Sequence, residues 1–357
     1  MRRVTGRELG IWLGQLPPGP HNDLTDVPGV AVGHVSLVRG HGRLIPGKGP
    51  VRTGVTAILP HGRSLYREPC RAGIEVFNGY GKSLGLQFIQ ETGVLNSPVL
   101  LTNTLSVYDV ANGAVTYLLG NNPEIGNDAR TPSVVVFECD DSYLNDIRGR
   151  HVRSSDAILA LQRANRNPVE QGNVGAGVGM SCFQLKGGIG SASRVIPGNQ
   201  GFVLGVLALA NFGLLQDLLI SGVPVGKELK LLAQGIVQGS LILVGITNAP
   251  LSSKQLDKIA KRAFLGMART GSVSRTGSGD FCLMVSNSDA GKGDNLSDWE
   301  LDGFFQASVE AGAESIWNSL FLAQTLDGRD GHIRHALPIQ ETLKIMRKRC
   351  NRPDTYV

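Results

Sequence analysis

Apolar residues along the chain fall into short continuous runs separated by longer segments with a helical period. Short runs rich in β-branched residues and bounded by turn residues are typical of buried strands, and they predict strands over 54–59, 98–102, 133–137, 202–208, 240–247 and 281–286. Apolar residues at helical spacing predict helices over 83–92, 107–119, 156–164, 253–270, 298–325 and 340–349. This mixture favours two stacked sheets flanked by helices.

The segment 253–270 has the clearest helical pattern. Lysines and arginines lie opposite its apolar stripe, Ser252 or Ser253 can cap its N-terminus, and the stripe consists of Leu256, Ile259, Ala260, Ala263, Phe264 and Met267. The segment 172–193 is instead rich in glycine, and we expect it to be a loop that approaches an active site. No change in composition marks a linker, so residues 1–357 are predicted to form a single domain.

Charge and cysteine usage narrow the class of protein. The 35 basic and 30 acidic residues give a net charge of +5 that is dispersed along the chain, and no nucleic-acid-binding motif accompanies it. The most apolar stretch, 201–215, is too short to span a bilayer and is interrupted by glycines. The five cysteines are odd in number and widely spaced, which favours a reducing compartment. We therefore expect a cytoplasmic protein that binds neither nucleic acid nor membrane.

Two motifs suggest ligands but fit them poorly. The segment 42–49 resembles a phosphate loop, yet Gly49 follows Lys48 where a hydroxyl should bind Mg²⁺, and flanking prolines oppose the required helix. A second group has metal-ligating side chains, although its sequence is typical of a turn with aspartates that cap backbone amides: Asp327, Asp330, His332 and His335. No metal and no cofactor is predicted.

A nucleophile-elbow pattern, G-x-S-x-G, is present at residues 81–85 and centres on Ser83. It lies early in the chain, with few strands ahead of it to build a central sheet. The histidines downstream that would complete a triad lie in no distinctive context. A serine hydrolase that uses Ser83 remains an alternative.

A second serine opens a strongly apolar predicted strand at Gly239-Ser240. Residues 277–280, Gly-Ser-Gly-Asp, lead into another such strand, so Ser278 and Asp280 would lie near Ser240 if the two strands are neighbours. No histidine is conveniently placed to act as its base. Backbone cleavage before Ser240 would create an α-amine, whose pKa of about 7.7–8.0 suits a general base better than the value of about 10.4 for lysine. The nucleophile would then carry its own base.

These residues belong to longer segments in which the chain resembles the L-aminopeptidase D-esterase/amidase family (DmpA-like), which includes the β-peptidyl aminopeptidases. The resemblance covers essentially the whole length. Its marks are GPVRTGVTAILPHG at 49–62, NGYGKSLGLQFIQETG at 78–93, LTNT at 101–104, ECDDSYLNDIRGRHV at 138–152, GAGVGMSCFQLKGGIGSASR at 175–194, GSLILVGITNAPL at 239–251 and ARTGSVSRTGSGD at 268–280.

The resemblance implies an α+β fold, a four-layer α-β-β-α sandwich of the N-terminal-nucleophile (Ntn) hydrolase type. It also implies a precursor that cleaves itself between Gly239 and Ser240 into an α subunit, 1–239, and a β subunit, 240–357. Members of this family release N-terminal residues from short peptides, amino-acid amides or esters, in some cases with D- or β-amino acids. Homo-oligomers of processed units are implied as well.

The same resemblance assigns roles to single residues. Ser240 is the nucleophile, and Ser278 and Asp280 hold its α-amine. Asn211 supplies an amide donor to the oxyanion hole, a contribution commonly worth about 3 kcal/mol of barrier. Glu138 recognises the free amino group of the substrate, and Tyr143 is the tyrosine of this segment that can reach the site. One departure is Asp280 itself, since some members carry a glutamate there.

An acyltransferase similar to ornithine acetyltransferase is the alternative within the same fold. Those relatives use a threonine nucleophile, whereas this chain has Ser240. An acyltransferase would form product only when an amine acceptor is present. The preferred amino acid cannot be inferred from the residues, because pocket shape decides it.

Overall fold

The computed structural model describes residues 3–11, 13–127, 130–198, 201–231, 239–288 and 296–350, the last residue by its backbone only. The strands are β1 (Ala31–Arg39), β2 (Val51–Leu59), β3 (Cys70–Gly79), β4 (Val94–Leu95), β5 (Val99–Asn103), β6 (Val135–Cys139), β7 (Ser181–Cys182), β8 (Leu185–Lys186), β9 (Gly188–Val195), β10 (Val203–Asn211), β11 (Ser240–Thr247), β12 (Gly279–Ser286), β13 (Leu326–Asp327) and β14 (Ile333–Arg334). The α-helices are α1 (Leu86–Thr92), α2 (Val107–Asn121), α3 (Ser154–Arg163), α4 (Val225–Glu228), α5 (Ser253–Arg269), α6 (Asp302–Phe321) and α7 (Ile339–Cys350).

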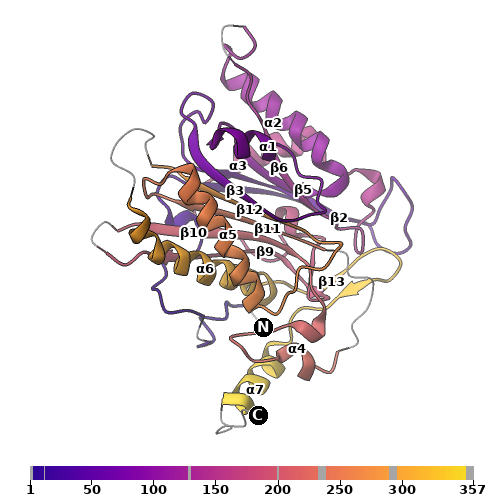
Figure 1. Ribbon diagram of the computed structural model, residues 1–357. Helices are drawn as coiled ribbons and strands as arrows, with labels where there is room; N and C mark the ends of the chain where they lie inside the picture. The colour runs from indigo at the N-terminus through magenta and orange to yellow at the C-terminus, as the bar shows by residue number, and fades with distance from the viewer. Residues whose placement is uncertain are drawn as a thin grey trace.

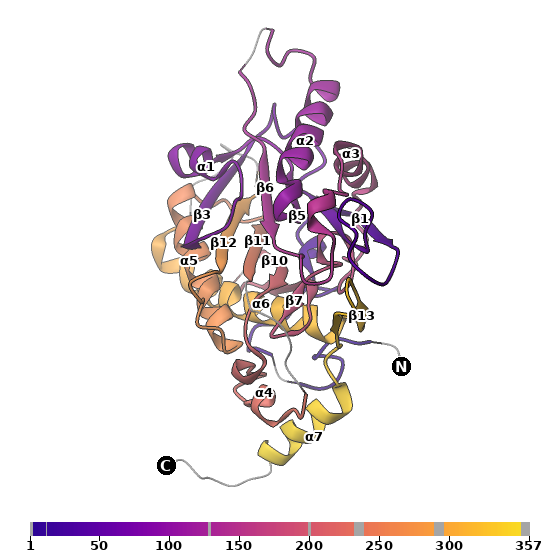
Figure 2. The same cartoon turned by 90° about the vertical axis from the view of Figure 1, so that its right-hand side faces the viewer.

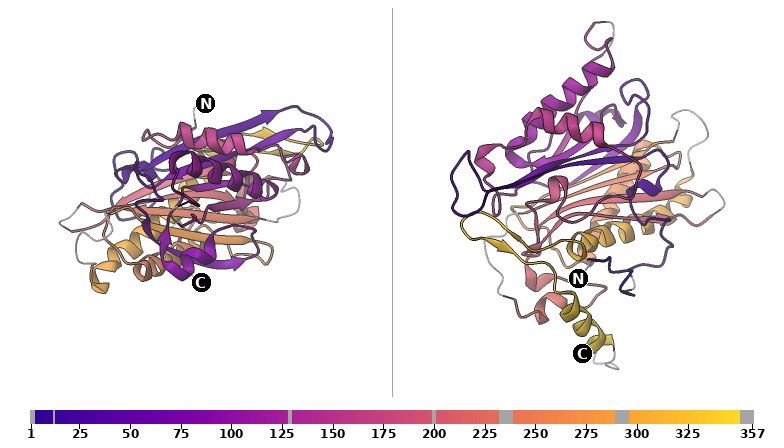
Figure 3. Two further views of the ribbon diagram at one scale, coloured as in Figure 1. Left: turned by 90° about the horizontal axis from the view of Figure 1, so that it is seen from above. Right: turned by 180° about the vertical axis from the view of Figure 1, so that it is seen from behind.

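Two mixed sheets lie face to face. One has the order β1-β2-β5-β6, and the other has the order β4-β3-β12-β11-β10-β9. Helices α2 and α3 cover the outer face of the smaller sheet, and α5 and α6 cover the outer face of the larger one (Figures 1 and 2). The order of layers is therefore helix, sheet, sheet, helix, as the resemblance implied, and Figure 3 shows it from above and from behind.

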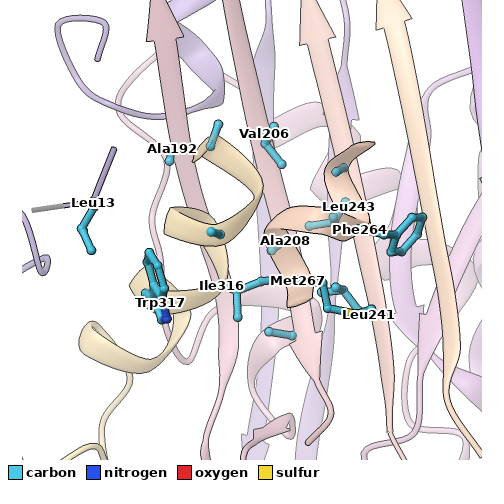
Figure 4. Packing of buried hydrophobic residues seen from close by; sticks show 14 of the residues in the cluster. Leu13, Ala192, Val206, Ala208, Leu241, Leu243, Phe264, Met267, Ile316 and Trp317 are labelled. Atoms are coloured by element: carbon cyan, nitrogen blue, oxygen red, sulfur yellow. The ribbon is translucent and has the colours of Figure 1, made fainter. Parts of the chain in front are cut away.

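Each interface between layers has its own apolar core. Phe137, Leu207 and Ile242 are among the buried residues that fill the space between the sheets. The outer faces of the strands pack under the helices, as Ala208 and Leu243 do beneath Ile316 and Met267 (Figure 4). Strand β11 is buried along its whole length, because it contributes to both cores. Its continuous apolar sequence follows from having a covered surface on each side.

The predicted elements are confirmed at all six strands and all six helices, with bounds that differ by a few residues. Helix α5 buries the stripe predicted for it. Its cap is Ser252, whose Oγ accepts a hydrogen bond from the Gln255 backbone N–H, while the Gln255 side chain accepts one from the Ser252 N–H. This reciprocal pair fixes where the helix begins.

Three long strands, β1, β3 and β9, were not predicted. Each contains a glycine where a helix crosses the sheet. A Cβ at Gly73 of β3 would lie 2.4 Å from the Asp257 backbone nitrogen of α5, and one at Gly190 of β9 would lie 1.9 Å from the Ser315 carbonyl oxygen of α6. These glycines allow the helix backbones to approach the strands closely, and they interrupt the apolar pattern that predicts a strand.

The expectation that 172–193 is a single loop was therefore wrong in part. Its last residues form β9, which pairs with β10, and its middle forms the short hairpin β7–β8. The buried side chain of Lys186 stabilises the hairpin region by hydrogen bonds. Its buried Nζ donates to the carbonyl oxygens of Gly177, Met180 and Gly187 at 3.0, 2.9 and 2.6 Å.

No described helix combines the length and the apolar character that a membrane crossing requires.

A buried ion-pair cluster ties the N-terminal segment to α6. The Nε of Arg194 lies 3.0 Å from Glu310 Oε2, and its NH2 lies 2.5 Å from Glu314 Oε2. Arg7 makes a second contact to Glu314 at 2.7 Å. Burial would raise the pKa of Glu314, but the Arg7 hydrogen bond and the charges of both arginines outweigh it and lower that pKa.

Replacing Arg194 with Ala should lower the free energy of unfolding by about 3–5 kcal/mol, because it leaves buried Glu310 without its ion-pair partner and leaves Glu314 with Arg7 alone. The matched control is Arg67→Ala, which breaks a surface pair with Glu124 and should leave that free energy nearly unchanged. Urea unfolding of both variants measures the difference. Equally small changes in the free energy of unfolding of both variants would show that the buried cluster stabilises the fold no more than a surface ion pair does.

Candidate active site

The site forms at the N-terminal end of β11, which lies between β10 and β12 in the larger sheet (Figure 1). Ser240 is the first residue of β11. It pairs with Asn211 of the antiparallel strand β10 on one side and with Gly279 of the parallel strand β12 on the other. The strands β11 and β12 are thus neighbours, which is the condition under which the sequence places Ser278 and Asp280 near Ser240. The Gly279 backbone N–H donates to Ser240 Oγ at 3.2 Å.

Asp280 follows in β12 and is fully buried. Its Oδ1 accepts hydrogen bonds from Ser278 Oγ at 2.7 Å and from the Leu241 backbone N–H at 3.0 Å. Its Oδ2 accepts one from Ser274 Oγ. Burial raises the pKa of Asp280, and these three donors oppose that rise only in part. The contact with Leu241 places the carboxylate beside the backbone at the start of β11, where a new α-amine of Ser240 would form.

The Asn211 side chain has a fixed orientation. Its Oδ1 accepts the Ser181 backbone N–H at 2.7 Å, and its Nδ2 donates to the Asp140 carbonyl oxygen at 2.8 Å. Both contacts would be lost if the amide were flipped, so the network itself assigns its oxygen and nitrogen. The Nδ2 group carries two protons, and this hydrogen bond uses one of them.

Glu138 is the penultimate residue of β6 in the facing sheet and is nearly inaccessible to solvent. Its Oε1 accepts the Lys82 backbone N–H at 2.7 Å, and its Oε2 accepts Thr104 Oγ1. Two glycines lie in close contact between Glu138 and Ser240. The backbone of Gly81 is next to the carboxylate, since a Cβ there would lie 3.3 Å from Glu138 Oε1. Gly279, which pairs with Ser240, is next to Gly81, since a Cβ at Gly279 would lie 2.6 Å from the Gly81 nitrogen. The carboxylate thus lies on the same side of the sheets as Ser240.

Tyr143 makes its contacts away from the nucleophile. Its ring stacks on His332 with centroids 4.4 Å apart, and the Arg334 guanidinium lies 3.5 Å from its centroid. Arg334 in turn donates through Nε to Ser181 Oγ at 2.9 Å. Arg334 and Ser181 therefore connect Tyr143 to the Asn211 network.

Cys139 lies directly behind the nucleophile, which the sequence did not indicate. Its Sγ is buried 3.4 Å from the Ser240 carbonyl oxygen. Burial raises the pKa of this thiol, and Glu138, Asp280 and the two following aspartates raise it further. A neutral thiol can donate to that carbonyl, but it is a poor nucleophile.

Ser274, Ser181 and Thr104 are further contacts that sequence reasoning did not assign. Ser274 and Thr104 lie inside segments already quoted for the resemblance, so their position in the chain was visible. Their partners were not, because each bond joins segments whose spatial relation depends on the pairing of the sheets.

Gly239 precedes the nucleophile in a space that admits no side chain. A Cβ there would lie 2.1 Å from the Asn211 carbonyl oxygen and 2.6 Å from the Phe212 Cα. A small pocket adjoins it and is lined by Phe212, Gly213, Asp217, Ser272, Val273, Arg275 and Ser278. The residue on the acyl side of the Gly239–Ser240 bond is therefore confined at its α-carbon.

The competing motifs have different surroundings. The Ser83 hydroxyl is buried and has no hydrogen-bond partner among the described residues, so it lacks the base that a nucleophile needs. Within the described ranges, no group of three metal-ligating side chains is found. The segment 42–49 forms part of the turn between β1 and β2 and leads into a strand, not into a helix that could hold a phosphate.

The chemistry available at this site is that of a hydroxyl, a buried carboxylate and an oriented amide. In the described part of the chain, no histidine or lysine side chain hydrogen-bonds Ser240 Oγ. Acyl transfer to Ser240 therefore needs a base from elsewhere, and the nearest one that cleavage can create is the amine of Ser240 itself.

The four cysteines with described side chains should resist iodoacetamide in the native protein at pH 8. Burial raises the pKa of Cys70 to about 12 and raises those of Cys139, Cys182 and Cys282 further. Mass spectrometry of native and denatured samples measures the alkylation at each thiol. Rapid modification of native Cys139 together with loss of activity would instead indicate a thiol nucleophile.

Comparison with known proteins identifies the family. The model of peptidase family S58 matches residues 22–334. The chain is 40% identical to "Beta-peptidyl aminopeptidase BapA" of Sphingosinicella microcystinivorans, with 96% of this chain and 91% of the relative covered. A second BapA, of Sphingosinicella xenopeptidilytica, is 36% identical over 97% of this chain and 92% of its own length.

Solved structures give the same result. The PH0078 protein of Pyrococcus horikoshii OT3 superposes with a TM-score of 0.93 at 48% identity, with 98% of this chain and 100% of that chain covered. The L-aminopeptidase D-Ala-esterase/amidase of Ochrobactrum anthropi, described as a prototype of the serine aminopeptidases and a variant of the Ntn-hydrolase fold, superposes with a TM-score of 0.90 at 32% identity, with 98% and 99% covered. The chain therefore has this Ntn-type sandwich fold and belongs to peptidase family S58.

Proposed function

We propose that this S58 aminopeptidase cleaves its own chain between Gly239 and Ser240, and that residues 1–239 and 240–357 remain together as α and β subunits. The observation that carries the proposal is the position of Ser240, at the start of β11 between the oriented Asn211 amide and the buried Asp280 carboxylate. Attack of Ser240 Oγ on the Gly239 carbonyl carbon forms an ester and frees the Ser240 amine. Water then hydrolyses the ester and leaves Gly239 as the carboxyl terminus of the α subunit.

In turnover the new amine acts as the general base. It takes the hydroxyl proton of Ser240 as Oγ attacks the substrate carbonyl, and it returns that proton to the leaving amine. Water repeats the sequence on the acyl-enzyme and releases the free acid. The Asp280 carboxylate stabilises the ammonium form, while the Ser278 hydroxyl fixes the carboxylate at 2.7 Å.

The remaining proton of Asn211 Nδ2 stabilises the oxyanion that forms on the carbonyl oxygen. One such donor commonly contributes about 3 kcal/mol to the barrier reduction. The Ser181 N–H and the Asp140 carbonyl hold the amide in place before substrate arrives, so no reorientation is needed during reaction.

Glu138 is proposed to bind the free amino group of the substrate. A buried carboxylate near the site attracts an ammonium group strongly, because little water screens the pair. The Lys82 N–H and Thr104 hydroxyl keep it oriented in the meantime. This contact would restrict cleavage to the residue with a free N-terminus, which is the property that defines an aminopeptidase.

The confined space at Gly239 bears on the choice of substrate. The acyl group of self-cleavage and that of turnover both become esters of Ser240 Oγ, so their carbons next to the carbonyl lie in similar places. An L-side chain on that carbon would meet the Asn211 carbonyl oxygen, 2.1 Å from its Cβ. Glycine and those β-amino acids whose side chain is on the carbon farther from the carbonyl leave this position unsubstituted. We therefore propose that such residues are preferred, as the names of the BapA relatives also suggest.

The acyltransferase alternative gains no support from the nucleophile, which is Ser240 and not a threonine. We also propose a homo-oligomer of processed units. The exposed apolar residues near and along α2, Leu105, Tyr108, Val115 and Leu119, offer a surface of the kind that interfaces cover. A cytoplasmic location is proposed as well, supported by the four cysteines with described side chains, none of which forms a disulfide.

The denatured mass of the purified protein tests self-cleavage. We expect two polypeptides that correspond to residues 1–239 and 240–357, and a single intact 38.0 kDa chain for Ser240→Ala. The variant should have no detectable aminopeptidase activity, whereas Ser83→Ala should process and hydrolyse normally. An intact wild-type chain that still hydrolyses aminoacyl amides would contradict the α-amine mechanism.

Substrate choice is tested with p-nitroanilides of β-homoalanine, glycine and L-alanine. We expect kcat/KM to be about 10-fold to 200-fold higher for the β-residue than for L-alanine, the range that one misplaced methyl group produces in a fitted pocket. Glycine should fall nearer to the β-residue. A preference for L-alanine would show that the acyl group of the substrate does not take the place of Gly239.

A further inference from the structure

The loop 271–278, between α5 and β12, adds a hydroxyl to the catalytic carboxylate. Ser274 Oγ donates to Asp280 Oδ2, the oxygen that neither Ser278 nor the Leu241 N–H contacts. In the described chain, Ser274 is therefore the only hydrogen-bond donor to that oxygen. Without it, half of a fully buried carboxylate would have no hydrogen bond.

The backbone at Ser274 supports a specific purpose for this contact. Its φ is +47°, in the left-handed region that residues with a Cβ seldom adopt. Its N–H donates to Ser272 Oγ at 3.2 Å. A disfavoured conformation persists only when surrounding contacts impose it, and such residues cluster at functional sites.

The contacts that impose it connect the loop to both neighbouring strand ends. Arg275 NH2 lies 2.7 Å from Asp217 Oδ2, in the segment that follows β10. The Arg275 carbonyl oxygen accepts Asn78 Nδ2 from the end of β3 at 3.0 Å. Next to Ser274, the loop is thus fixed on two sides, and its hydroxyl is held toward Asp280.

We propose that Ser274 is a positioning residue, which holds the Asp280 carboxylate in the orientation and charge state that the amine of Ser240 requires. This inference rests on the proposed roles of Ser240 and Asp280. Ser274 does not touch the reacting atoms. It acts through Asp280, together with Ser278 on the other oxygen.

Removal of the Ser274 hydroxyl should shift the pH profile of the enzyme in one direction. A donor to an ionised carboxylate favours its charged form, so its loss makes Asp280 easier to protonate. The loss also leaves the remaining negative charge less dispersed, which makes the neighbouring ammonium harder to deprotonate. Both effects move the acid limb of the pH profile upward. On β6, Cys139 faces Asp280 with a neutral thiol, and Arg275 and Asp217 on the flanking segments neutralise each other.

The test compares Ser274→Ala with Ser274→Gly in the full-length, processed protein. Both lack the hydroxyl, but glycine adopts a positive φ freely and alanine does not. We expect the acid limb of kcat/KM to rise by about one pH unit in both, and the neutral-pH value to fall by about 10-fold to 100-fold, the effect of losing one hydrogen bond to a charged group. The exposed neighbour Thr276→Ala should match the wild type.

Two results would overturn the proposal. If neither Ser274 variant changes the pH profile, the hydroxyl has no role in holding Asp280. If alanine impairs the enzyme while glycine equals the wild type, the backbone conformation is what matters and the hydroxyl is not. Asp280→Asn distinguishes a wrong role for Ser274 from a wrong role for Asp280. Full activity in that variant would show that Asp280 itself takes no part in the mechanism.

Discussion

The pairing of three strands, β10, β11 and β12, is the constraint on which the site depends. Backbone hydrogen bonds set Ser240 opposite Asn211 on one side and opposite Gly279 on the other, so the register of the sheet fixes which polar groups surround the nucleophile. A shift of one residue in either pairing would turn Ser240 or Asp280 to the opposite face. Two packed cores hold the register, because the apolar residues of β11 are divided between them.

Burial shifts the pKa values of the ionisable groups at the site, and hydrogen bonds offset the free-energy cost of burying its polar groups. Asp280 has no exposed surface, yet each of its oxygens accepts a hydrogen bond. Asn211 has a partner on its oxygen and one on its nitrogen, so its amide has a fixed orientation before any substrate binds. The Cys139 thiol stays neutral behind Ser240 because its pKa is raised. The result is a preorganised site that lacks a base, and the proposed cleavage between Gly239 and Ser240 would supply one.

Sequence patterns predicted the elements that have uninterrupted apolar runs. They placed Ser278 and Asp280 near Ser240 on the condition that the two strands are neighbours, and the strands do pair. They failed for β9, where Gly190 makes room for α6, and for β3, where Gly73 makes room for α5. In both strands the interruption is a packing requirement from another layer, which local periodicity does not contain. The contacts of Ser274 and Cys139 were missed for a similar reason, since each joins segments that only the paired sheets bring together.

The central claim is that the α-amine of Ser240 is the catalytic base. Acetylation of the processed protein near pH 7 tests it directly, since an α-amine has a lower reference pKa than the lysine side chain and is the more reactive amine at that pH. We predict that activity falls in proportion to the fraction of acetylated Ser240 amine, measured by peptide mass spectrometry. A bound product amine should slow both the acetylation of Ser240 and the loss of activity. Full activity with a completely acetylated Ser240 amine would contradict the account.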